Sequence, residues 1–159
     1  MAIPILLFVI AFLVRVAIGA VFPEPAYPDA LYYANLGREL AGSGTFSVDY
    51  IWNFVEVGGT LPAAGVLPIP SNAHWMPLAA LVQVPFIWVM GPTPVASALP
   101  FWLAAAATAP LTWFVARDAG LLSWQGAAAG LLVAVPAGVT PFLGQPENFA
   151  IFMLLGTLA

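Results

Sequence analysis

Residues 2–22, AIPILLFVIAFLVRVAIGAVF, form an apolar run that is interrupted only by Arg15. At about 1.5 Å per residue, a helix of this length covers a hydrocarbon core of about 30 Å. A cleaved signal peptide carries its cations before the apolar core, whereas this arginine stands late in the run. The stretch therefore predicts a retained first transmembrane helix and indicates an integral membrane protein.

The composition of the whole chain agrees with this prediction. Of its 159 residues, 62% are hydrophobic and 6% are charged, and the mean hydropathy is +0.99. Soluble globular proteins carry about 25% charged residues. The net charge of −4 includes only three cations, so the chain has no basic patch for a nucleic acid, and we expect no nucleic-acid partner. The absence of cysteine excludes disulfides and thiolate metal sites.

A long polar interval, residues 23–76, follows the first helix and holds five of the seven acids. Within it, residues 29–41 are predicted to form an amphipathic helix, because Pro28 precedes them, apolar residues recur at helical spacing and glycines follow. Such a helix lies on a membrane surface rather than crossing it. Residues 44–70 mix aromatics with glycine and proline without a sustained period, which is typical of a loop that can hold short strands.

Three further apolar segments follow, at residues 77–90, 95–116 and 121–142. The second and third have spanning length and are predicted to be transmembrane helices with kinks at their prolines. The first covers only about 21 Å as a helix, so we expect it to be re-entrant or interfacial. Residues 148–159 predict the start of another transmembrane helix, and because this segment is too short to span, we expect the chain to be the N-terminal part of a longer protein.

The segment at 77–90 decides which loops share a side of the membrane. If it re-enters, two crossings separate the loop at 23–76 from the loop at 144–148, and both face the same side; if it crosses, they face opposite sides. The positive-inside rule favours the first arrangement, because Arg117 then faces the cytoplasm. The predicted fold is an all-α integral membrane protein: a polytopic transmembrane helix bundle with an amphipathic surface helix in a long first extracytoplasmic loop.

Two acids stand at predicted helix starts, each directly after a proline: Asp29 and Glu147. An acid in this position complements the helix macrodipole and contributes about 1 kcal/mol. Alternatively, a partly desolvated carboxylate at a membrane surface has a raised pKa and accepts a proton from a hydroxyl or an amine, as a general base does. The residues alone leave both interpretations open, but the two acids can form one site if their loops share a face.

Two arginines are candidate phosphate ligands. Arg15 lies in a predicted membrane helix, where a cation costs at least about 2.5 kcal/mol near the middle, so it must snorkel to the surface or find a partner among the loop acids or on a phosphate. Arg38 is either a solvated partner of Glu39 or a cation for a phosphate ester. Tyr32 and Tyr33, behind the first acid, can pack on a ligand or on the membrane interface.

His74 stands where the long loop returns toward the membrane. It is an interfacial anchor, a structural hydrogen-bonding residue or a substrate contact. The sequence shows no cluster of histidines and acids at zinc-binding spacing. We therefore predict no cofactor and no metal site, and the spacing gives no indication of a divalent cation.

Four stretches resemble the N-terminal half-module of the GT-C glycosyltransferases, most of all the protein-mannosyltransferase and aminoarabinose-transferase type. They are LVRVAIGAVF, PDALYYANLGRELAGSGTF, HWMPLAALVQVPFIWVMG and ALPFWLAAAATAPLTWFVARDAGLLS. The family has an arginine near the end of the first helix, an aspartate followed by a tyrosine in a surface helix, and a proline-containing re-entry. This sequence departs from the family pattern at Ala30, where a second acid is common, and at Met76, where a second proline is common.

The resemblance implies transfer of a sugar from a polyprenyl-phosphate donor to an acceptor lipid, glycan or protein, with inversion, at the outer face of the plasma (inner) membrane. Membrane lipids would surround the helices. The resemblance also implies that this part by itself lacks activity, because further helices complete the donor groove in the family. The implied roles are a catalytic base for Asp29, a second acid near the site for Glu147, donor-phosphate binding for Arg15 and Arg38, and substrate binding for Tyr32, Tyr33 and His74.

A non-enzymatic polytopic protein, such as part of a transporter or an assembly subunit, is the alternative. Transporters place ionisable residues near the bilayer midplane in broken helices, often within a repeated half. Here most acids lie in one extramembrane loop and no internal repeat is visible. This charge placement favours the enzyme.

Overall fold

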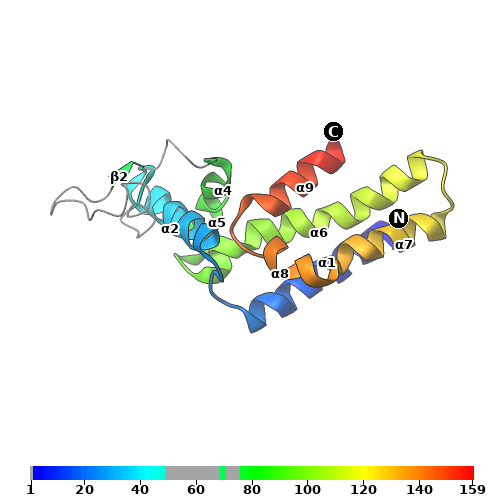
Figure 1. The fold of residues 1–159 in the computed structure, drawn as a ribbon, viewed down its shortest axis with the longest axis horizontal. Helices are drawn as coiled ribbons and strands as arrows, with labels where there is room; N and C mark the ends of the chain where they lie inside the picture. The colour runs from blue at the N-terminus through cyan, green and yellow to red at the C-terminus, as the bar shows by residue number, and fades with distance from the viewer. Residues whose placement is uncertain (1, 49–68, 71–75) are drawn as a thin grey trace.

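The computed structural model describes residues 2–48, 69–70 and 76–159, and this part of the chain is mostly helical (Figure 1). The elements, in chain order, are α1 (Ala2–Val21), α2 (Pro28–Ser43), β1 (Ser47–Val48), β2 (Ile69–Pro70), α4 (Leu78–Leu81), α5 (Val84–Met90), α6 (Pro94–Asp118), α7 (Ser123–Ala134), the 3-10 turn η1 (Ala137–Val139), α8 (Thr140–Leu143) and α9 (Asn148–Leu158).

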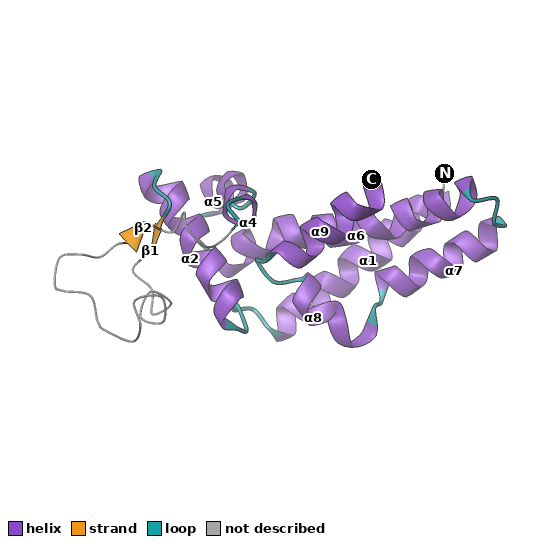
Figure 2. Ribbon diagram, turned by 45° about the horizontal axis from the view of Figure 1, so that its top comes forward, coloured by secondary structure: helices purple, strands orange, loops and turns teal. Residues whose placement is uncertain are grey.

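Helices α1, α6, α7 and α9 form an elongated bundle, and α2, α4, α5 and the two strands gather at one of its ends (Figures 1 and 2). Helix α6 packs against α1, α7 and α9 along the bundle, whereas α2 packs against α4, α5 and β1. The two short strands pair antiparallel, with Ser47 opposite Pro70. The start of α1 and the turn between α6 and α7 lie at the end opposite α2 (Figure 1).

Two described helices, α1 and α6, are long and apolar enough to cross a membrane. They confirm the helices predicted at 2–22 and 95–116, and α6 continues through Pro100 and Pro110 without a break. Helix α1 exposes apolar side chains such as Ile5 and Leu13 while it buries Arg15. An apolar outer face and a buried ion are the arrangement that a hydrocarbon surrounding requires.

The segment at 121–142, predicted as a transmembrane helix with a kink at its proline, is bent as expected but is not one continuous helix, and whether it crosses the membrane stays a prediction. Helix α7 ends at Ala134, and η1 and α8 continue after a bend of 46°. Pro136 explains the break, because proline has no backbone N–H and its ring clashes with the carbonyl four residues earlier. Ala137 adopts a positive φ of 47°, which turns the chain out of the helix.

The helix predicted at 29–41 is confirmed as α2, and it ends at Gly44, whose φ of 74° is left-handed and whose N–H donates to the Leu40 carbonyl. Its apolar side, however, packs on protein: Tyr32, Tyr33 and Leu36 are each 1% exposed. Helices α4, α5 and α6 cover this side, so it is not free to rest on lipid, while the location of α2 at a membrane surface stays a prediction.

The segment predicted at 77–90 as re-entrant or interfacial forms two short helices, α4 and α5, neither of spanning length. The apolar segment predicted at 148–159 contains α9, of 11 residues.

Close packing of α7 rests on two glycines, Gly126 and Gly130. A Cβ atom added at Gly130 would lie 2.9 Å from the Ala109 carbonyl oxygen, and one at Gly126 would lie 3.0 Å from the Trp113 ring. Glycines four residues apart let membrane helices approach closely. The bundle therefore uses a G-x-x-x-G pattern that is readable in the sequence.

Candidate functional site

The chain segments that follow α1 and α8 meet at the α2 end of the bundle. The Ala26 N–H donates to the Gln145 side-chain oxygen at 3.0 Å, and the Trp102 indole N–H donates to the Gly144 carbonyl at 2.8 Å. These bonds connect the first loop, the second loop and α6. The prediction that the two acidic loops lie together is confirmed for the molecule, while the side of the membrane they face remains a prediction.

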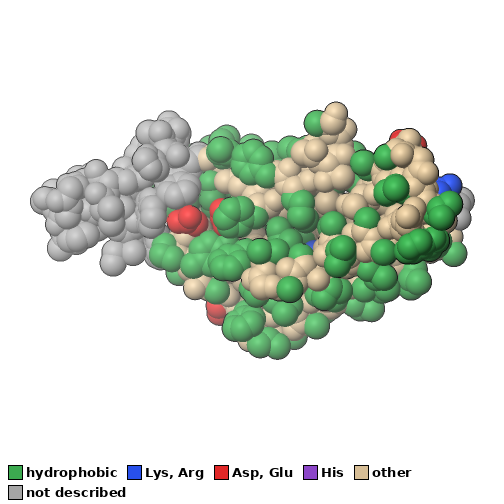
Figure 3. Space-filling view, turned by 45° about the vertical axis from the view of Figure 1, so that its right-hand side comes forward, with side chains coloured by type: hydrophobic (Ala, Val, Ile, Leu, Met, Phe, Trp, Pro, Cys, Tyr) green, Lys and Arg blue, Asp and Glu red, His purple; other side chains and the backbone are tan. Residues whose placement is uncertain are grey.

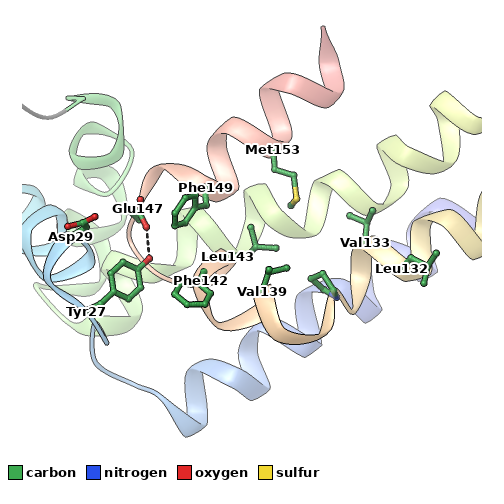
Figure 4. Close-up of a pocket in the computed structure, with 11 residues that line it drawn as sticks. Tyr27, Asp29, Leu132, Val133, Val139, Phe142, Leu143, Glu147, Phe149 and Met153 are labelled. Atoms are coloured by element: carbon green, nitrogen blue, oxygen red, sulfur yellow. Dashed lines mark hydrogen bonds between the residues drawn. The ribbon is translucent and has the colours of Figure 1, made fainter.

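Both predicted acids stand at helix starts, as expected. Asp29 lies in the first turn of α2, and Glu147 is the N-cap residue of α9. The Glu147 side chain makes no capping hydrogen bond to its own helix. It is instead directed at Tyr27, so capping does not account for its position (Figure 4).

The two acids line the same groove, which has a volume of about 710 Å³. With Tyr27 they stand at one end of it, and the remaining wall is apolar and follows α7, α8 and α9 (Figure 4). The apolar lining residues are Leu132, Val133, Pro136, Val139, Phe142, Leu143, Phe149 and Met153. In the space-filling view, acidic atoms stand beside a largely hydrophobic surface (Figure 3). One end of the groove is therefore acidic, and the rest of its wall is apolar.

A tyrosine holds one of the acids in place. The Tyr27 hydroxyl donates to the Glu147 carboxylate at 2.5 Å, and Glu147 is only 7% exposed. Burial raises the pKa of Glu147, the charge of Asp29 adds to the rise, and the hydrogen bond from Tyr27 opposes it. Burial, followed by the contact with Glu147, raises the pKa of Tyr27 well above its ordinary value. Tyr27 is thus a protonated donor at neutral pH, and Glu147 has the increased proton affinity that general acid–base groups have.

Tyr27 was not among the residues predicted from sequence. The signal was present, because it lies two positions before Asp29 in the stretch YPD. Its ring also contacts Phe142, with ring centroids 5.6 Å apart, so it closes the acidic end of the groove against α8. A side chain on a loop shows no periodicity, and only the folded contact reveals its partner.

Tyr32 and Tyr33, predicted to bind substrate, lie in the core and not on the groove wall. Their rings pack edge to face with centroids 5.6 Å apart. The Asn148 amide donates to the Tyr33 hydroxyl at 2.7 Å. Because the other helices cover this side of α2, these tyrosines connect α2 to α9 and to the core rather than facing a ligand.

Arg15 also lies away from the predicted partners. Its guanidinium is 0% exposed and donates to the carbonyls of Ala11 at 3.1 Å, Val133 at 3.2 Å and Ala134. The expectation that it snorkels or meets a loop acid is therefore wrong, because the broken end of α7 supplies closer acceptors.

Arg38 donates to the Asn35 side chain at 3.4 Å, and it does not line the groove. No cation is present among the described residues of the groove wall. His74 lies outside the described residues. Within the described ranges, no group of three or more histidines or acids is arranged to hold a metal ion.

In comparisons with known proteins, the chain matches no protein-family model, no curated protein and no solved structure.

Proposed function

We propose that the chain belongs to a polytopic glycosyltransferase that transfers a sugar from a polyprenyl-phosphate-linked donor to an acceptor at the extracytoplasmic face of the plasma membrane. The proposal rests on one observation: Asp29 and Glu147, which are far apart in sequence, lie together at one end of a single apolar groove. An apolar trough suits a polyprenyl chain, since its burial removes apolar surface from water. An acidic end suits the sugar and the acceptor.

The reaction assigns a role to each acid. Asp29 accepts the proton of the acceptor hydroxyl while that oxygen attacks the anomeric carbon. The bond between this carbon and the phosphate oxygen breaks, its electron pair leaves with the polyprenyl phosphate, and the configuration inverts. Glu147, oriented by Tyr27, acts as the second acid at the reacting end. The leaving phosphate needs cationic stabilisation. Neither arginine predicted for this role is at the described groove wall, because Arg15 is committed to backbone carbonyls and Arg38 does not line the groove.

The orientation follows from the positive-inside rule. The start of α1 and the end of α6, whose last turn holds Arg117, lie at the end of the molecule opposite α2 (Figure 1). With Arg117 in the cytoplasm, the acidic end of the groove faces outward. A lipid-linked donor can then present its sugar to Asp29 at the membrane surface.

The proposal is tested with radiolabelled polyprenyl-phosphate mannose, glucose and aminoarabinose, each supplied to membranes that contain the full-length protein. We expect label transfer from one of these donors, and we expect Asp29→Asn to lower its rate by about 10²- to 10⁴-fold, which is the usual contribution of a general base. Glu39→Gln, on the same helix, is the matched control and should retain the rate. Transfer at the wild-type rate by Asp29→Asn would exclude Asp29 as the base. Absence of transfer by the wild-type protein from all three donors would favour the non-enzymatic alternative.

A further inference from the structure

The break after α7 leaves backbone carbonyls without their helical partners. In a continuous helix, the carbonyls of Val133 and Ala134 would accept from the N–H groups of residues 137 and 138. Helix α7 instead ends at Ala134, and the chain turns away at Pro136. Water does not reach acceptors in an apolar surrounding, so other donors in the protein must satisfy these carbonyls.

Arg15 supplies those donors from the neighbouring helix. It lies in α1, and its terminal nitrogens reach the carbonyls of Val133 and Ala134 across more than a hundred residues of sequence. The side chain is fully buried, and its Nε atom has no hydrogen-bond partner among the described residues. The partial negative charge at a helix C-terminus favours a cation at this position. The terminal nitrogens of Arg15 therefore satisfy the two carbonyls that lack helical partners.

The bonded residues adjoin the candidate site. Val133 and Pro136 line the groove, and so does Val139 beyond the bend, whereas Arg15 does not. We propose that Arg15 is a positioning residue whose guanidinium replaces the backbone donors lost at the Pro136 break and thereby holds the bend that shapes the groove wall. This role is independent of what the groove binds.

A double-mutant cycle tests the proposed coupling. For the full chain in detergent micelles, we expect Arg15→Met to lower the ratio of folded to unfolded protein by about a hundredfold, because buried acceptors lose a charged donor. In a Pro136→Ala background, backbone N–H groups can continue α7, and the same change should cost less than about tenfold. If Arg15→Met lowered the ratio of folded to unfolded protein equally in both backgrounds, the proposal would be overturned. If Arg15→Met yields no folded protein, Arg15→Gln, whose amide can donate to a carbonyl, takes its place.

A distance measurement tests the bend without reference to stability or sugar transfer. The chain has no cysteine, so spin labels can be placed on Trp124→Cys, near the start of α7, and Val139→Cys, beyond the bend; both positions are exposed. We expect a narrow distance distribution with Arg15 present and a broadened or shifted one in Arg15→Met. Arg117→Met is the control, since this exposed arginine donates to the Leu121 carbonyl in the α6–α7 turn. An unchanged distribution in Arg15→Met would contradict the positioning role.

Discussion

Replacing Tyr27 with phenylalanine removes one hydroxyl from the acidic end of the groove and leaves the ring that contacts Phe142. The lost bond joins a neutral donor to a carboxylate that is 7% exposed. Hydrogen bonds to charged groups contribute about 1.5–3 kcal/mol, against about 0.5–1.5 kcal/mol between neutral groups. We therefore expect Tyr27→Phe to lower the free energy of unfolding by about 1.5–3 kcal/mol at a pH high enough to ionise Glu147.

The expected loss depends on pH in a defined direction. The Tyr27 hydrogen bond opposes the rise in the pKa of Glu147, so its removal should raise that pKa further. Near pH 4, where Glu147 carries a proton in both proteins, the loss should shrink to the value of a neutral bond. For a chain of this size, about 1.5–3 kcal/mol corresponds to a fall of roughly 3 to 12 °C in the midpoint of thermal unfolding.

Thermal unfolding of the full chain in detergent, followed by circular dichroism between pH 4 and pH 8, measures this difference. Tyr33→Phe is the matched control, because its hydroxyl accepts from Asn148, which does not titrate. We expect its effect to be nearly independent of pH. If Tyr27→Phe lowered the unfolding midpoint as little at pH 8 as at pH 4, Glu147 would not be a buried carboxylate that Tyr27 stabilises.

Three further predictions address Glu147, the helix packing and the orientation. Burial raises the pKa of Glu147 in the folded protein, so the wild-type protein should lose stability as the pH rises above about 4.5, and Glu147→Gln should not show this loss. Unfolding midpoints measured across the pH range test this. If the midpoints of the two proteins changed with pH in the same way, the prediction would be wrong. Gly130→Leu should lower the unfolding free energy by about 1–3 kcal/mol, since a Cβ there meets the fixed Ala109 carbonyl, and an unchanged midpoint would show that the helices are not so close. In intact cells, a membrane-impermeant thiol reagent should label Glu24→Cys, whereas Asp118→Cys should react only after permeabilisation; the opposite pattern would reverse the orientation.

Much of the helical framework was predictable because it depends on local composition. The long apolar runs identify α1 and α6, and the proline and glycine boundaries identify α2. The two acids were recognisable because each follows a proline at a helix start. A kink at Pro136 was predicted, but not that the helix ends there, since Pro100 and Pro110 lie inside α6 without interrupting it. Whether a proline bends or ends a helix depends on the partners that its surroundings offer.

The residue sequence is sufficient to identify helices that are long and apolar enough to cross a membrane and to single out Asp29 and Glu147, because hydropathy, helix length and helix starts depend on neighbours along the chain. The groove, the bond between Tyr27 and Glu147, and the contact of Arg15 with Val133 and Ala134 join residues more than a hundred positions apart. No periodicity connects such pairs. They arise because helices that pack side by side must satisfy every buried polar group, and the partners that do so are chosen by the packing of the whole bundle.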